Sequence, residues 1–478
     1  MDRGDHQGRH DGPQGLTPCL GAGRAPGVGR ACAGRALGRH RSGPTYFSVV
    51  SRRRRSAEGT TRPSLPPGYL VIWTTVAVDL VGFGIVAPIL PLYAERFHAS
   101  GTTVGLLFAS FSLAQFLCAP ILGRLSDRIG RKPVILLSLF GTAAGSIVTG
   151  VAGAVWVLFL GRIIDGASGA SVSVAQGAVT DLASPEQRPR LLGMLGAAFG
   201  VGFVIGPALG GLGSLIGPRV PFFVAGGIAF VNGLVAIVRL PETRPSTRRL
   251  TARPEVLPAP DSAVAAERRR RLRALAVVGF LSIAAFAGFE STFSLLGKRR
   301  FGLTIGSASV VFLGIGLFMV VVQGGLVGRV TGALGAVRAL RGGLLLTACG
   351  LALLAAATRW IVLVPALALL ALGQGIASPT LTSLVANRAH DERRGEALGF
   401  QQAAGSLARI AGPAAAGLLF DHAGIPWPYL VGAALSALAL ALVFGPAGGH
   451  EPIGGVAHGA HGQPVARMHP TESAAAAE

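Results

Sequence analysis

Charged residues are scarce in this sequence. Of the 478 residues, 14% are Asp, Glu, Lys or Arg, whereas 50% are hydrophobic, and the mean hydropathy is +0.56. Soluble domains carry about 25% charged residues, so this chain cannot surround an apolar core with a polar surface. The composition excludes an ordinary water-soluble fold and predicts that much of the surface faces lipid.

Lysine, cysteine and aromatic residues are also few. Lys132 and Lys298 are the only lysines, so arginine supplies most of the positive charge behind the net value of +21. The basic residues lie between apolar stretches and do not alternate with aromatic residues, which argues against a nucleic-acid partner. Four cysteines, two of them inside apolar runs, predict no structural disulfide.

Motifs of enzymes and ATP-driven pumps are missing as well. The sequence has no HExxH, no phosphate-binding GxxxxGK and no GxSxG following a strand. None of its ten histidines falls inside an apolar stretch long enough to cross a membrane. We therefore expect no enzymatic activity, no bound cofactor and no metal site.

Twelve stretches are long and apolar enough to span a bilayer, which takes about 20 residues at about 1.5 Å per residue. Short loops join most of them, so consecutive helices should be antiparallel neighbours. The predicted spans are residues 69–93, 102–122, 133–153, 156–181, 191–212, 221–239, 274–296, 306–327, 342–357, 361–386, 397–420 and 428–446.

Three segments lack such stretches. Residues 1–66 form a basic tail rich in Gly, Arg and Pro, without the apolar core of a signal peptide, and residues 448–478 form a second tail. We expect both tails to be disordered. Residues 241–273 are charged and contain proline, so we interpret them as a linker between an N-terminal bundle, 67–240, and a C-terminal bundle, 274–447.

The distribution of basic residues predicts the orientation. Alternate loops hold 22 Lys and Arg residues, against six in all the other loops. Because basic loops stay in the cytoplasm, both termini should be cytoplasmic, in a multi-pass protein of the plasma membrane. The basic loops are 123–132, 183–190, 239–273, 328–341 and 387–395.

The two halves of the chain repeat each other. When the sequence is shifted by about 206 positions, Gly206 and Pro207 fall on Gly412 and Pro413, within a longer series of matches. Parallel six-helix repeats are a transporter architecture, with the substrate path between the halves. We therefore predict an all-α polytopic membrane protein in which twelve transmembrane helices form two pseudo-symmetric six-helix bundles.

The loop after the second span packs glycines, an acid and several bases into a tight turn. It strongly resembles the loop signature of the major facilitator superfamily, which implies a latch that closes the cytoplasmic side. We expect Gly123 to permit close helix approach, Gly130 to permit the turn and Asp127 to pair with nearby arginines or to meet a helix N-terminus. Two charges near the next basic loop resemble the partner site, although ordinary pairing at helix ends explains them equally well. The latch residues are Gly123, Asp127, Arg128, Gly130, Arg131, Lys132, Asp181 and Arg188.

The fifth span contains a run of glycines around a proline. Gly202, Gly206, Pro207, Gly210 and Gly211 match the antiporter motif of the same superfamily. Small residues four apart let a neighbouring helix slide closely past, and Pro207 bends the helix. Static helix packing is the alternative explanation.

Five charges within the predicted spans are candidates for proton coupling. Arg162 and Asp165 share one face of the fourth span, and Asp165 stands where the superfamily more often has an uncharged polar residue. Asp79 lies in the first span, whose sequence resembles the first helix of drug:proton antiporters of the tetracycline-efflux and multidrug type. A carboxylate there can take up and release a proton, or it can simply join helices. Glu290 and Arg409 complete the set.

Five glutamines within the spans could line a substrate cavity or bridge helices. Few aromatic residues accompany them, and three of the four tryptophans lie at span ends, which weakens a sugar site. The glutamines are Gln115, Gln323, Gln374, Gln401 and Gln402.

Proton-coupled export of a small amphipathic compound is the function that these features favour. We expect a monomer in the lipid bilayer that uses the proton gradient as its energy source. Uptake of a metabolite or sugar by a symporter of the same fold is the nearer alternative. A receptor or a catalytic membrane protein would need a folded soluble domain, which no segment provides.

Overall fold

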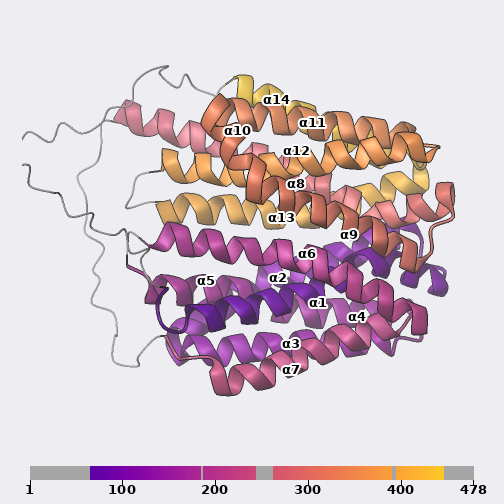
Figure 1. Cartoon of the computed structure of the whole chain (residues 1–478), viewed down its shortest axis with the longest axis horizontal. Coiled ribbons are helices and arrows are strands. Elements are labelled where there is room, and N and C mark those ends of the chain that lie inside the picture. The colour runs from indigo at the N-terminus through magenta and orange to yellow at the C-terminus, as the bar shows by residue number, and fades with distance from the viewer. Residues whose placement is uncertain (1–64, 185–186, 244–261, 390–393, 446–478) are drawn as a thin grey trace, which may run out of the picture. The chain divides into compact units, whose positions relative to one another are not determined.

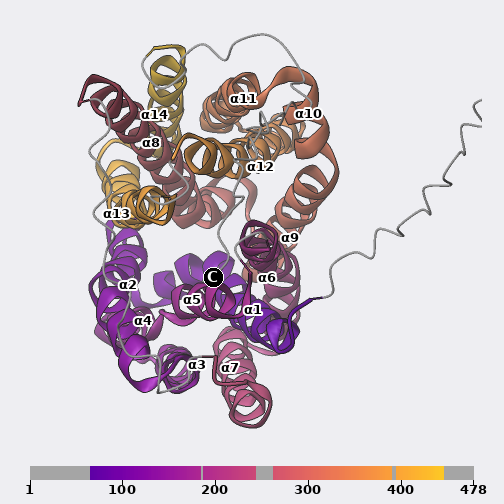
Figure 2. The same ribbon diagram turned by 90° about the vertical axis from the view of Figure 1, so that its left-hand side faces the viewer.

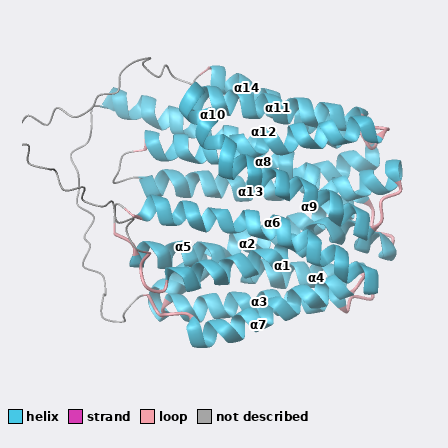
Figure 3. Ribbon diagram, in the orientation of Figure 1, coloured by secondary structure: helices cyan, strands magenta, loops and turns pink. Residues whose placement is uncertain are grey.

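The computed structural model describes residues 65–184, 187–243, 262–389 and 394–445. The chain divides into two compact units, Met1–Arg62 and Pro63–Glu478, and every described residue belongs to the second. The described residues are almost all helical and include no strand (Figure 3). The predicted tails, apart from residues 65–66, and residues 244–261 of the predicted linker lie outside the described ranges.

Twelve helical segments in the described part of the chain are long and apolar enough to cross a membrane, which confirms the predicted number. Figure 1 shows them as a bundle of antiparallel helices. The N-terminal half contains α1 (Tyr69–Ala94), η1 (Glu95–Phe97), α2 (Gly101–Ile129), α3 (Arg131–Gly150), α4 (Val155–Ser168), α5 (Ser171–Leu182), α6 (Arg188–Ile216) and α7 (Val220–Arg239). The C-terminal half contains α8 (Ser262–Phe301), α9 (Ile305–Val321), η2 (Val322–Leu326), α10 (Val327–Leu334), α11 (Ala336–Ala356), α12 (Trp360–Arg388), α13 (Arg394–His422) and α14 (Trp427–Phe444).

Two of the spans are interrupted helices. The fourth consists of α4 and α5, which are separated by Gly169 and Ala170. The eighth contains a π-helical segment, η2, between α9 and α10. Hydropathy does not register the interruption at Gly169 and Ala170, because these residues are as apolar or as small as their neighbours.

One helix begins earlier than the sequence pattern predicts. α8 starts at Ser262, inside the segment that we interpreted as linker, whereas the predicted seventh span starts at residue 274. An ion pair between Glu267 and Arg271, four residues apart, stabilises this basic first part of the helix. The added turns are charged, so an apolar pattern cannot detect them.

The two halves pack their helices in equivalent ways. In the N-terminal half α1 contacts α6 and α7, and α3 contacts α4 and α7; in the C-terminal half α8 contacts α13 and α14, and α11 contacts α12 and α14. Between the halves α6 lies against α9, and α2 lies against α13 (Figure 2). The equivalent pairing confirms the predicted pseudo-symmetry.

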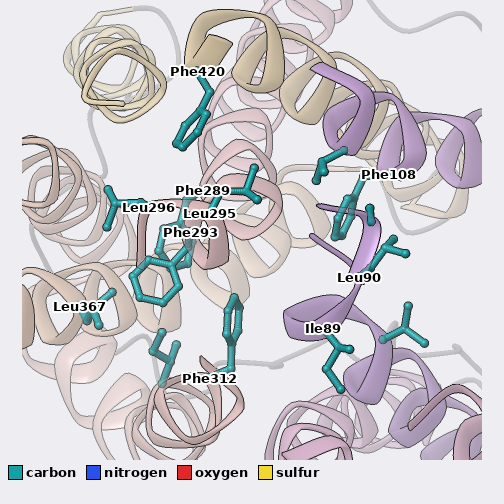
Figure 4. Close-up of a cluster of buried hydrophobic side chains, with 14 of the residues drawn as sticks. Ile89, Leu90, Phe108, Phe289, Phe293, Leu295, Leu296, Phe312, Leu367 and Phe420 are labelled. Carbon is teal, nitrogen blue, oxygen red and sulfur yellow. The ribbon is translucent and has the colours of Figure 1, made fainter. Parts of the chain in front are cut away.

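The apolar core differs between the two ends of the bundle. We call the end that carries the start of α1, the α2–α3 loop and the end of α7 the linker end, and the other the opposite end. At the opposite end one core includes Ile89 and Phe108 from the N-terminal half with Phe289 and Phe312 from the C-terminal half (Figure 4). At the linker end each half has a separate core. Within the described residues, the apolar core that the two halves share therefore lies at the opposite end.

Polar contacts reinforce this junction at the opposite end. The Asp421 carboxylate accepts hydrogen bonds from the backbone N–H groups of Gly101 (2.9 Å) and Thr102 (2.7 Å), at the start of α2. Lys298 forms an ion pair with Glu95 at 2.6 Å. Each contact links one half of the chain to the other.

Candidate functional site

Asp79 lies on α1 beside the interruption of the fourth span. Its Oδ2 accepts a hydrogen bond of 2.5 Å from the Ser171 hydroxyl, and its Oδ1 is buried without a hydrogen-bond partner. Ser171 is the first residue of α5, directly after the break. The broken helix thus presents a hydroxyl to the first-span acid, a partner that sequence reasoning did not identify.

The break itself is held by a glutamine from the second span. Gln115 Nε2 donates a hydrogen bond of 2.7 Å to the Gly169 carbonyl, which the interruption leaves without a helical partner. A free carbonyl is costly in hydrocarbon, so a side-chain donor stabilises the interruption. In this structure Gln115 therefore bridges two spans.

Arg162 and Asp165 form a buried ion pair on α4. The distance from Arg162 Nη1 to Asp165 Oδ2 is 2.8 Å, and Arg162 is 2% exposed. The guanidinium carbon lies 4.1 Å from the centre of the Phe111 ring, a cation–π contact with α2. The arginine faces the bundle interior, as its cost in lipid requires.

Glu290 and Arg409 bring the C-terminal half to the same charged region. Arg409 and Arg162 both act electrostatically on Glu290, and Glu290 Oε1 is buried without a hydrogen-bond partner. Asp165 and Asp79 carry like charges and repel each other. The five charges chosen from sequence thus form one electrostatic network of three carboxylates and two guanidinium groups, drawn from both halves.

Arg131 organises the loop between α2 and α3. Its guanidinium contacts the Asp127 carboxylate at 3.0 Å, the Asp181 carboxylate at 3.0 Å and the Ser126 hydroxyl at 2.7 Å. Gly130, with φ of 106°, makes the turn in a conformation that favours glycine. All of these partners belong to the N-terminal half.

Glu242, just after α7, is a further partner of this loop that the sequence pattern did not single out. Its carboxylate accepts hydrogen bonds from the backbone N–H groups of Arg131 (2.9 Å) and Lys132 (3.1 Å), at the start of α3. A carboxylate there satisfies free donors and complements the helix dipole. No sequence pattern links Glu242 to the start of α3, so only the folded chain reveals this cap.

One expectation for the loop signature needs correction. No atom lies within 4 Å of the position that a Cβ at Gly123 would occupy, so Gly123 does not support a close helix approach in this conformation. Asp181 pairs with Arg131 of the loop, as the resemblance to a partner site implies, whereas Arg188 is exposed on the next helix. Arg128 is likewise exposed.

The glycines of the fifth span form a close contact with the first. A Cβ placed at Gly202 would lie 2.5 Å from the Leu80 carbonyl oxygen, and one at Gly206 would lie 2.5 Å from the Gly84 Cα. Gly210 faces α1 one turn further on, whereas Gly211 faces Ser309 of α9 in the other half. Pro207 is accommodated inside the continuous helix α6.

The remaining predicted glutamines divide into two groups. Gln374 accepts a hydrogen bond of 3.3 Å from Ser282, and Gln401 donates one of 3.4 Å to Thr382, so both bridge helices. Gln323, within η2, and Gln402 are exposed. Within the described ranges no group of three His, Cys, Asp or Glu side chains could hold a metal ion.

Twelve spans in two equivalent halves, with charges from both halves meeting inside the bundle, define a multi-pass secondary active transporter. The sequence pattern of the Major Facilitator Superfamily matches residues 72–336 and 324–467. The chain belongs to the Major Facilitator Superfamily.

Its relatives include proteins named for drug resistance. The chain is 34% identical over 383 residues to the class C tetracycline resistance protein of Escherichia coli, a match that covers 78% of this chain and 95% of that protein. It is 27% identical to multidrug resistance protein 1 of Bacillus subtilis (strain 168), with 78% and 94% covered. Among solved structures, the human organic anion transporter MFSD10 (TETRAN) is 28% identical, with a TM-score of 0.63, covering 79% of this chain and 100% of that one.

Proposed function

We propose that the chain is a proton-coupled antiporter that exports a small amphipathic compound by alternating access. The observation that carries the proposal is the charge balance inside the bundle. The network contains three carboxylates and two guanidinium groups, so among the described residues it has one more negative than positive charge. An uncompensated charge is costly at low dielectric, and one bound proton neutralises the network.

Asp79 is the acid that we assign to the transported proton. Asp165 already pairs with Arg162, and the negative charge of Glu290 is attracted by two arginines, Arg409 and Arg162. The only hydrogen-bond partner of Asp79 among the described residues is the neutral hydroxyl of Ser171. A proton there removes charge without breaking an ion pair, and Glu290 serves as the second acid.

Movement of the two halves supplies the alternating access. Asp79 joins α1 to the broken fourth span, and α1 packs closely on the glycines of α6. A change of charge at Asp79 therefore acts on α1 and on α6, which can slide past each other, and α6 in turn lies against α9 of the other half. We take the linker end as cytoplasmic, because the basic loops cluster there, and both termini then lie in the cytoplasm.

The similarity to proteins named for tetracycline and multidrug resistance supports export as the direction. The proton gradient is the energy source, the transporter works as a monomer without a cofactor, and it makes no covalent change to its substrate. An uptake symporter on the same fold would move protons and substrate in the same direction, so the direction of proton flow separates the two functions.

Inverted membrane vesicles that hold a pH gradient test the proposal. Tetracycline added to wild-type vesicles should release protons from the lumen, followed with a pH-sensitive dye. Asp79→Asn should insert normally and abolish this release, whereas Glu267→Gln, which alters an exposed ion pair on α8, should leave it intact. Unchanged release in Asp79→Asn would overturn the role of Asp79, and acidification of the lumen would indicate symport.

A further inference from the structure

A groove with a volume of about 350 Å³ runs along the flank of α1, between α6 and α7. Figure 2 shows α1 at the rim of the bundle with α6 on one side and α7 on the other. Asp79 bonds instead to α5, so the groove is separate from the charged network. The groove is lined by Trp73, Thr74, Ala77, Val78, Val81, Val201, Ile205 and Ile228.

The surroundings of this groove are lipid. All three helices that line it are membrane spans, and their outward faces carry exposed apolar side chains such as Ile205 and Val231. The lining exposes apolar atoms alone. An acyl chain fills such a surface without leaving a polar group unsatisfied.

Two arginines lie on the same helical faces as the groove, nearer the linker end. Arg190 precedes Val201 on α6 by eleven residues, and Arg239 follows Ile228 on α7 by eleven residues. Eleven residues are close to three full turns, so each arginine lies on the same face as its groove residue, about 16 Å along the helix. Both arginines are exposed, and neither forms an ion pair with another described residue.

This spacing matches the dimensions of a phospholipid. One leaflet contributes about 15 Å of hydrocarbon, half of the bilayer core. If the headgroup of a phospholipid lies at the level of the arginines, the methyl end of its acyl chain therefore reaches the level of Val201 and Ile228. The positive charge at one end and the apolar groove at the other complement an anionic lipid.

We propose that the groove binds one acyl chain of an anionic phospholipid whose phosphate lies between Arg190 and Arg239. The site prefers anionic to zwitterionic lipid, because each basic residue near the membrane surface strengthens binding of an anionic headgroup about fivefold. The assignment does not depend on which compound the protein transports.

Trp73 provides a reporter inside the site. Its indole N–H donates a hydrogen bond of 2.8 Å to the Met194 carbonyl, which fixes the ring in the wall of the groove. The other three tryptophans, Trp156, Trp360 and Trp427, are exposed at the opposite end and can be replaced by Phe. Bromine atoms on a bound acyl chain would then quench Trp73 alone.

The test reconstitutes this single-tryptophan protein in phosphatidylcholine with increasing fractions of phosphatidylglycerol brominated midway along its chains. We expect quenching at roughly 25-fold lower fractions than brominated phosphatidylcholine requires, about fivefold for each of the two arginines. The variant Arg190→Gln/Arg239→Gln should quench equally with both lipids. Arg188→Gln, two residues away on a different face of α6, is the matched control and should keep the preference.

A second variant tests the acyl-chain part of the site. Thr74→Phe fills the groove from its exposed side and should weaken quenching by the anionic lipid, although both arginines remain. Equal quenching of the parent protein by the two lipids would overturn the proposal. A preference for the anionic lipid that survives the loss of both arginines would also overturn the proposal, because the preference would then come from the general positive charge of the protein surface.

Discussion

Arg162 illustrates how burial dictates pairing at the scale of single residues. Its guanidinium is almost completely buried, pairs with Asp165 and lies over the ring of Phe111. An arginine inside a bilayer costs at least about 2.5 kcal/mol on insertion scales. The loss of its ion-pair partner should therefore be far more costly than the loss of a partner on the surface.

We expect Asp165→Leu to lower the free energy of unfolding in detergent by about 3 kcal/mol, because it leaves Arg162 buried beside fewer acids. The double variant Arg162→Met/Asp165→Leu should recover much of this loss. Thermal unfolding followed by tryptophan fluorescence measures both, with Glu267→Ala at an exposed pair as a control that changes stability by about 0.5 kcal/mol or less. A double variant that is no more stable than Asp165→Leu would contradict the account of the pair.

The sequence singles out the five network charges because a charge inside an apolar run is conspicuous. Hydrogen-bond partners are not conspicuous, either in the network or in the α2–α3 loop: Ser171 lies 92 residues from Asp79, and Glu242 lies 111 residues from Arg131. Nothing local distinguishes these two side chains from the other serines and glutamates. Partner choice depends on distances that exist only after the helices have packed.

At the scale of the element, α6 is defined by its contact with α1. Gly202 and Gly206 let the two backbones approach so closely that a Cβ at either position would overlap α1. Larger side chains at such a contact must push the helices apart. The contact explains why glycines recur four residues apart in this span.

Gly206→Leu should therefore disrupt the α1–α6 contact and lower the melting temperature, with a loss of roughly 3 kcal/mol or more in unfolding free energy. Gly227→Leu on α7 is the matched control, because no atom lies within 4 Å of a Cβ at that position. Differential scanning fluorimetry of both variants checks the expectation. Equal melting temperatures for the two would show that the close contact does not contribute to stability.

Hydropathy predicts the number and approximate position of the spans because lipid burial demands about 20 apolar residues for each. It cannot predict the interruption at Gly169 and Ala170, where the backbone leaves the helix but the side chains remain small and apolar. That interruption places Ser171 beside Asp79. The feature that matters most to the candidate site is thus a backbone feature without a hydropathy signal.

At the scale of the whole described bundle, the contact between the two halves is uneven. They share an apolar core and the Lys298–Glu95 ion pair at the opposite end, whereas each has its own core at the linker end. The sequence repeat predicts two equivalent halves. It does not predict at which end they meet, because that depends on the conformation and not on the pattern.

The central claim is that protonation of Asp79 moves one half of the protein relative to the other. Spin labels at Gly196 on α6 and Gly328 on α10, after replacement of the native cysteines, would report this movement, since the space beside both positions is open. We predict that the distance between the labels changes when the pH of the reconstituted wild-type protein is lowered. In Asp79→Asn, which holds no titratable acid at this position, the distance should be the same at both pH values. An identical pH-dependent change in Asp79→Asn and wild type would contradict the account.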